Sequence, residues 1–122
     1  MNFYQPLSSL SEEPENNILN IDYAYFERAA IILKALNHKF RQHLLKAVYT
    51  NEPVSVTKIH LVMHVEQSVA SLHLAILRRA GIVSVIRDGK YNFYSVNYKR
   101  IKEISQFAKA LMDTFQFDLP AM

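Results

Sequence analysis

The chain lacks cysteine and tryptophan, and it contains only two glycines among its 122 residues. The absence of cysteine excludes disulfides, thiolate nucleophiles and thiolate metal sites. Two isolated glycines, Gly81 and Gly89, exclude a glycine-rich phosphate-binding loop. No uncharged apolar run approaches the roughly 20 residues that a membrane span needs, and the N-terminus shows no secretory signal. These absences predict a cytoplasmic protein that is soluble and does not enter a membrane.

Other chemistry is also missing. The sequence shows no activated nucleophile and no paired acids that would share a cleft, so we expect no enzymatic activity and no cofactor. Half of the residues are apolar, which is typical of one globular domain. The protein is therefore expected to work by binding.

The charge of the chain is distributed unevenly. The formal net charge is only +3, but residues 1–27 carry five acids and no lysine or arginine. Residues 28–109 carry all 14 basic residues against four acids, a net charge of +10. A segment this basic suits a polyanion such as DNA. A solvated surface balanced by the acidic N-terminal segment explains the same numbers, and charge alone does not decide between them.

The apolar pattern predicts helices and one hairpin. Residues 1–20 are interpreted as a flexible acidic arm and residues 21–117 as the folded domain. Helices are expected over residues 22–36, 39–49, 55–63, 67–79 and 97–115, and β-prone segments over 82–86 and 91–96. The turn between those segments, residues 87–90, is expected to centre on Asp88-Gly89.

Local signals mark the helix ends. Asp22 and Ser55 are expected as N-caps, Asn37 as a left-handed residue that ends the first helix, and Gly81 as the stop of the fourth. The side chains expected to face outward from the second helix are Lys39, Arg41, Gln42 and Lys46. A helix–turn–helix followed at once by a hairpin is the winged-helix arrangement, mainly α with a small β-hairpin.

The helix over 67–79 has an unusual polar face. Ala70, Leu74 and Leu77 recur at helical spacing and predict the buried stripe. The opposite face carries short, uncharged, hydrogen-bonding side chains where solvated helices usually carry Glu and Lys; they are Gln67, Ser68, Ser71 and His73. This favours a face that touches base edges.

Three stretches in the right order and spacing resemble the ArsR/SmtB-type bacterial winged-helix repressors. The first is Gln67-Ser68 with Ser71, His73-Leu74, Leu77-Arg78 and Ala80-Gly81-Ile82-Val83, which looks like the family's recognition helix and the start of its wing. The second is Arg87, Gly89-Lys90, Phe93-Tyr94 and Asn97, similar to the wing tip and returning strand. The third is Leu36-Asn37-His38 followed by Arg41, similar to the opening of the family's second helix.

The resemblance implies a transcriptional repressor, a homodimer paired through its first and last helices, and a palindromic double-stranded DNA operator. It also implies an effector that changes DNA affinity, which the sequence does not identify. The aromatic residues of the terminal segments favour a dimer core over a ligand pocket; they are Tyr23, Tyr25, Phe26, Phe107, Phe115 and Phe117.

The residue types at these positions suit DNA. Gln67 can pair with adenine, and the serines can bond base edges or phosphate. His73 is expected to meet a phosphate or a guanine, the alternative being a partly buried, hydrogen-bonded helix residue. Arg87 and Lys90 on the wing, with Arg41 and Lys58, are expected to contact phosphates, although turn solubility alone would also explain the wing cations.

Three residues depart from the family pattern. Leu72 stands where the family usually has a polar residue and is expected at the DNA face, against a thymine methyl. Glu66 replaces the usual serine cap and would repel phosphate. His64 replaces the usual turn glycine. These departures keep open an alternative function, a winged-helix module that binds another protein and has lost its operator.

The metal sensors of the family are not expected here. The positions that hold cysteine pairs in many relatives hold Ser55 and Thr57, and the last helix contains no histidine. His60 and His64, spaced i and i+4, are the one alternative metal pair. Two ligands are too few, so the prediction is no metal site.

Overall fold

The computed structural model of the chain describes residues 19–114. The elements along the chain are α1 (Tyr23–Leu36), α2 (Lys39–Asn51), β1 (Val54–Ser55), α3 (Val56–Met63), α4 (Gln67–Arg79), β2 (Val83–Asp88), β3 (Tyr91–Val96) and α5 (Tyr98–Thr114). All five helices and the hairpin match the sequence prediction. The acidic arm, apart from its last two residues, and Phe115 and Phe117 lie outside the described residues.

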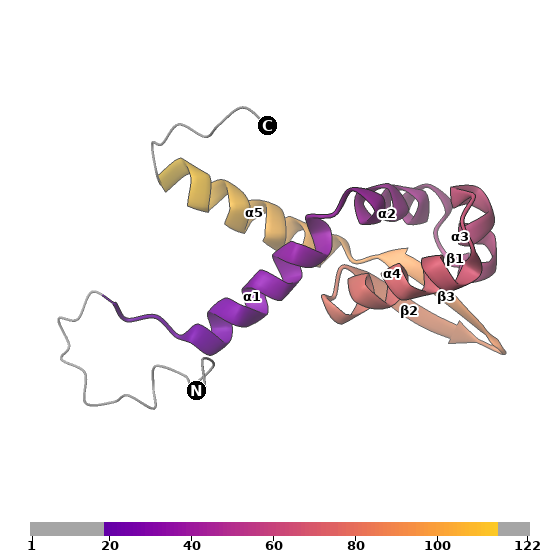
Figure 1. Cartoon of the computed structure of the whole chain (residues 1–122), viewed down its shortest axis with the longest axis horizontal. Helices are drawn as coiled ribbons and strands as arrows, with labels where there is room; N and C mark the ends of the chain where they lie inside the picture. The colour runs from indigo at the N-terminus through magenta and orange to yellow at the C-terminus, as the bar shows by residue number, and fades with distance from the viewer. Residues whose placement is uncertain (1–18, 115–122) are drawn as a thin grey trace.

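The elements form a body and two projecting helices. Helices α2, α3 and α4 pack with the small sheet, whereas α1 and α5 cross near the body and then diverge from it (Figure 1). Within residues 19–114, no helix combines the length and the apolar character needed to span a membrane. The body contains a winged helix-turn-helix unit, in which α3 and α4 are the helix pair and β2 and β3 the wing.

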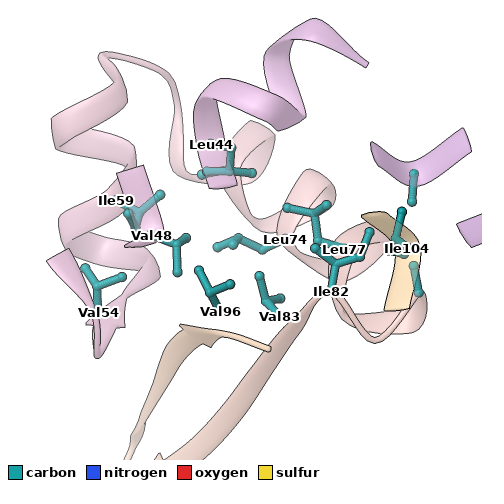
Figure 2. Close-up of a cluster of buried hydrophobic side chains, with 13 residues drawn as sticks. Leu44, Val48, Val54, Ile59, Leu74, Leu77, Ile82, Val83, Val96 and Ile104 are labelled. Carbon is teal, nitrogen blue, oxygen red and sulfur yellow. The ribbon is translucent and has the colours of Figure 1, made fainter. Parts of the chain in front are cut away.

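The core of the body is apolar and closely packed. Figure 2 shows Leu44 and Val48 of α2, Ile59 of α3, and Leu74 and Leu77 of α4 converging on the side chains of the sheet. All five are fully buried, and each contributes about 1.5–3 kcal/mol through removal from water. Because α4 buries this stripe, its opposite face must point outward.

The sheet contains a strand that the sequence did not predict. The strand order is β1-β3-β2, and β1 pairs antiparallel with β3 through Val54 opposite Tyr94 and Ser55 opposite Phe93. Two residues carry no alternation that a pattern search can detect. The pairing joins the start of α3 to the wing, so the helix pair and the hairpin share one rigid base.

The wing turn lies one residue later than expected. Strand β2 continues to Asp88, which pairs with Tyr91, and the two-residue turn is Gly89-Lys90. Gly89 has φ +64°, and tight hairpin turns of two residues require positive φ, which glycine adopts without strain. The prediction that Asp88-Gly89 centres the turn was therefore wrong, and Arg87 belongs to the strand.

The four helix ends were confirmed, but the backbone conformation expected at one of them was not. Oδ1 of Asp22 accepts from the Ala24 amide at 3.1 Å, Oγ of Ser55 accepts from the Lys58 amide at 3.3 Å, and Gly81 follows α4 with φ +74°. Asn37 follows the last residue of α1, as predicted, but its φ is −81°, outside the left-handed region. Side chains of α2 donate to the carbonyls of the last turn of α1.

Candidate nucleic-acid interface

The outward face of α4 carries the polar residues that the sequence places there. Gln67, Ser68 and Ser71 are exposed, and Leu72 beside them leaves 60% of its surface exposed. Ala70, Leu74 and Leu77 are fully buried on the other side. The expected division of the helix into a core face and an outward face is confirmed, with Leu72 on the outward face.

The corner before α4 sets the angle at which this face is presented. His64 has φ 56° and ψ 42°, the left-handed conformation that a glycine adopts more easily. The Val65 amide donates to the carbonyl of His60 at 3.1 Å, and Nδ1 of His60 lies 3.2 Å from the Val65 carbonyl. Glu66 is the N-cap of α4 and makes no capping hydrogen bond through its side chain.

His73 does not share the exposure of its polar neighbours. It is half buried, its ring centroid lies 4.8 Å from that of Phe40, and its Nδ1 lies 3.2 Å from Nη1 of Arg41. Burial lowers the pKa of His73, and the positive charges of Arg41 and His38 lower it further. The structure matches the alternative interpretation of a partly buried, hydrogen-bonded residue, so its placement on the outward face was wrong.

Arg41 also turns inward. Its guanidinium donates to the carbonyls of Ala35 at 2.6 Å and Lys34 at 3.1 Å, in addition to its contact with His73. The prediction that this side chain faces outward from α2 was wrong, because the last carbonyls of α1 need donors. Gln42, although exposed, donates from Nε2 to the Leu36 carbonyl at 3.0 Å in the same way.

The wing carries two exposed cations. Arg87 donates from Nε to the Gly89 carbonyl at 3.1 Å, which holds its guanidinium beside the turn, and Nζ of Lys90 lies 5.5 Å from the Tyr91 ring centroid. Strand β2 runs back alongside α4, so the turn projects at the end of the molecule where α4 begins (Figure 1). The fold therefore brings the wing cations and the start of α4 to one end.

Lys58 lies in the first turn of α3. Its side chain is exposed, while its backbone amide donates to the Ser55 cap. Helix α3, which carries Lys58, packs against α4. Of the nine residues expected at DNA, seven are exposed; they are Gln67, Ser68, Ser71, Leu72, Arg87, Lys90 and Lys58. The other two, Arg41 and His73, contact each other.

The alternative metal pair is not supported by its geometry. Helix α3 ends at Met63, so His64 lies beyond it in a left-handed conformation and does not stand at i+4 on the same helix face as His60. Among residues 19–114, no group of three or more histidine, aspartate or glutamate side chains is placed to hold a metal ion.

The projecting helices expose apolar side chains. On α1, Tyr25 and Phe26 leave 69% and 66% of their surface exposed, and Phe107 and Leu111 on α5 are also exposed. Between the two helices lies a hollow whose lining is mostly apolar; it is lined by Ala29, Ile32, Leu33, Ile104 and Phe107, together with Arg100 and Glu103. Apolar surface of this extent is typical of a protein–protein contact.

The sequence did not indicate that Phe40 and His38 enclose His73. Phe40 reads as an ordinary core residue of α2, and His38 reads as part of a helix break. In the structure Nδ1 of His38 accepts from the Arg41 amide at 3.3 Å, and its ring lies 5.2 Å from that of His73. The one available signal was a histidine at an N-cap position, where it is uncommon.

Comparisons with known proteins point to transcription. No protein-family model matches the chain. The uncharacterised HTH-type transcriptional regulator MJ1325 of Methanocaldococcus jannaschii is 37% identical over 86 residues, which cover 70% of this chain and 97% of that protein. The transcriptional activator HlyU of Vibrio cholerae is 30% identical over 84 residues, covering 69% of this chain and 77% of that protein.

Solved structures show the same fold. HlyU of Vibrio cholerae superposes with a TM-score of 0.55 at 28% identity, over 70% of this chain and 94% of that chain. The homodimeric winged helix-turn-helix DNA-binding domain of Mb0332 from Mycobacterium bovis, a possible ArsR-family regulator, gives a TM-score of 0.63 at 17% identity. That match covers 90% of this chain and all of the other.

Proposed function

Because this chain belongs to the ArsR/SmtB-type winged helix-turn-helix transcriptional regulators, we propose that it binds a palindromic DNA operator as a homodimer. It acts by binding rather than by catalysis, and it acts in the cytoplasm. The observation that carries the proposal is the outward face of α4, uncharged and hydrogen-bonding, placed at the same end of the body as the cationic wing.

In this proposal α4 enters the major groove. Gln67 reads adenine through its amide, Ser68 and Ser71 bond base edges or phosphates, and Leu72 contacts a thymine methyl. Helix-turn-helix proteins present the first residues of the recognition helix to the bases. These four side chains occupy the first six positions of α4, which is the portion that reaches deepest.

The cations supply affinity rather than sequence discrimination. Arg87 and Lys90 on the wing and Lys58 on α3 neutralise phosphates, which releases counterions and makes binding depend on salt. Arg41 and His73 are not assigned to DNA contact, because the three guanidinium nitrogens of Arg41 and Nδ1 of His73 already have partners inside the protein. Glu66 near the start of α4 selects against a phosphate at that point.

The homodimer forms through α1 and α5. Both helices project from the body and expose aromatic and aliphatic side chains that a second copy would cover. A two-fold dimer places two copies of α4 about one helical turn of DNA apart, which a palindrome matches. The proposal is supported by the Mb0332 domain, which has the same fold and is homodimeric.

The test is a selection of bound duplexes from a random pool, followed by titration of the enriched sequence and a scrambled duplex. The expected result is a two-fold symmetric motif, bound at least about 10³-fold more tightly than the scrambled duplex at physiological salt. Equal, weak binding to every duplex would contradict the proposal. A partner protein that is recovered by pull-down and contacts Leu72, together with no enriched duplex, would favour the interaction-module alternative. The exposed Leu61 and Leu72 are the observation that supports it.

A further inference from the structure

One guanidinium joins the projecting helix α1 to the recognition helix α4. Arg41 donates from Nε to the Ala35 carbonyl at 2.6 Å and from Nη2 to the Lys34 carbonyl at 3.1 Å, both in the last turn of α1. Its third nitrogen, Nη1, lies 3.2 Å from Nδ1 of His73 in the middle of α4. The planar, fixed fork of arginine makes the three directions rigid relative to one another.

The contact fixes the protonation state of His73. A guanidinium only donates, so Nδ1 of the histidine must accept and the ring proton must lie on Nε2. Phe40 lies at 4.8 Å and His38 at 5.2 Å from the His73 ring, between centroids, and both restrict its rotation. The ring therefore has one orientation in which it can accept from Arg41.

We propose that Arg41 is a positioning residue that couples the angle of α1 to the angle of α4 through His73, and that protonation of His73 opens this coupling. The inference rests on the proposed function, because it concerns how the reading face is aimed at the operator. It assigns no DNA contact to either residue.

The coupling matters because of where α1 lies. Helix α1 projects from the body and supplies part of the proposed dimer face, so the partner subunit determines its direction (Figure 1). The spacing of the two copies of α4 on DNA depends on how rigidly each follows its own α1. His73 directly follows Leu72 and stands two residues after Ser71, so an anchor at His73 acts where the reading side chains end.

A fall in pH should weaken the contact between Arg41 and His73. Burial first, then the charges of Arg41 on α2 and of His38 at its N-cap, lower the pKa of His73, so the ring is neutral and able to accept at pH 7. No carboxylate contributes to the shift, and the last turn of α1, which includes Lys34, contacts Arg41 through the carbonyls of Ala35 and Lys34. Protonation puts a hydrogen on Nδ1 that faces the N–H of Arg41, so the contact is lost as pH falls.

The variants separate coupling from folding. Arg41→Lys keeps the charge but cannot reach three acceptors at once, and His73→Leu removes the acceptor. His73→Asn keeps an acceptor close to the Nδ1 position and cannot be protonated in this range. The matched controls are Gln42→Ala, which uncaps α1 without touching His73, and His38→Asn, which keeps an N-cap acceptor and removes the other histidine of the cluster.

The measurement is the dissociation constant for the selected operator and for a scrambled duplex, between pH 7.5 and 5.5, with thermal unfolding followed for each variant. At pH 7.5, Arg41→Lys and His73→Leu should bind the operator about tenfold more weakly, while binding to the scrambled duplex changes less than about twofold. Wild-type operator preference should fall with acid. His73→Asn should bind like wild type at pH 7.5 and lose that pH dependence. Gln42→Ala should keep it unchanged, and His38→Asn should keep it but shift it to higher pH, because one of the charges that lower the pKa of His73 is removed.

Two results would overturn the inference: operator binding by Arg41→Lys and His73→Leu equal to wild type, or an unchanged pH dependence in His73→Asn. If Arg41→Lys unfolds, the histidine variants decide the question alone. A wild-type protein with no operator preference at any pH would instead contradict the proposed function.

Discussion

The hydroxyl of Tyr98, at the start of α5, donates a hydrogen bond of 2.5 Å to Oε1 of Glu52, the C-cap residue that follows α2. The other carboxylate oxygen of Glu52 accepts from the Val96 amide of β3 at 3.0 Å. One carboxylate therefore connects α2, the wing and the projecting helix α5. Through these two bonds, Glu52 attaches the start of α5 to the body.

Removal of the Glu52 carboxylate should destabilise the protein. Glu52→Ala leaves the amide of the nearly buried Val96 without a partner, which costs about 1–3 kcal/mol of unfolding free energy. Glu52→Gln keeps an acceptor and should lose less. Denaturant unfolding of the three proteins at pH 7 measures the difference, and equal stability of Glu52→Ala and wild type would show that the bond contributes nothing.

The same contact should delay the ionisation of one tyrosine. The hydrogen bond to Glu52 is the main cause that raises the pKa of Tyr98 to about 12, with smaller contributions from burial and nearby charge. The pKa of Tyr98 is higher in the folded than in the unfolded protein. The stability that the bond confers is therefore present at neutral pH and is lost as pH rises above about 10. Absorbance titration should show one late tyrosine that disappears in Tyr98→Phe.

Leu72 should read thymine methyl groups. Replacement of individual thymines of the selected operator by deoxyuridine removes only the methyl group, and at the contacted position it should weaken wild-type binding by about 1 kcal/mol, roughly fivefold. Leu72→Ala should bind the two operators equally, because the apolar partner of the methyl is gone. If wild-type protein binds every uracil-substituted operator as well as the parent, Leu72 does not contact a thymine methyl.

An acidic residue on α1 should separate the dimer. Phe26 leaves 66% of its surface exposed in the single chain, so Phe26→Glu should fold normally but place charge inside the proposed contact. The dimer dissociation constant from sedimentation should rise more than tenfold, by above about 1.4 kcal/mol, and operator affinity should fall with it. Tyr49→Gln, at an exposed aromatic outside α1 and α5, is the control and should remain dimeric. An unchanged assembly in Phe26→Glu would place the contact elsewhere.

The wing lysine should act through charge alone. Lys90→Ala should weaken binding to operator and scrambled duplex alike and lower the salt slope of log K by about one for each wing that contacts a phosphate. Lys109→Ala, at an exposed cation in the second half of α5, should leave the slope unchanged. A loss of operator preference without a change in slope would mean that Lys90 contacts bases.

The two glycines should respond differently to alanine. Both have positive φ, so a Cβ is strained at either position by about 1–2 kcal/mol. At Gly81 the Cβ would also lie 3.0 Å from Nε of Arg100, whereas at Gly89 it would meet nothing within 4 Å. Gly81→Ala should therefore lower the free energy of unfolding more than Gly89→Ala. Equal losses would show that Arg100 moves aside without cost.

Periodicity and local signals were sufficient for most of the fold. The 3.6-residue spacing of Ala70, Leu74 and Leu77 determines which side of α4 is buried, since only one face of a helix can carry that spacing. Asp22, Ser55 and Gly81 mark helix ends through bonds and dihedrals within a few residues. The exposure of Gln67, Ser68, Ser71 and Leu72 follows from the same spacing.

Tertiary structure decided the features that depend on distant partners. Strand β1 is a strand only because β3 offers an edge 40 residues later in the chain, as Val54 opposite Tyr94 shows. Arg41 and His73 are polar residue types that usually lie at the surface, yet they meet although 32 positions separate them in the chain. They meet because Arg41 donates to a carbonyl at the end of α1, where the helix itself supplies no donor. A sequence fixes what each side chain can donate or accept; only packing determines which acceptor comes within reach.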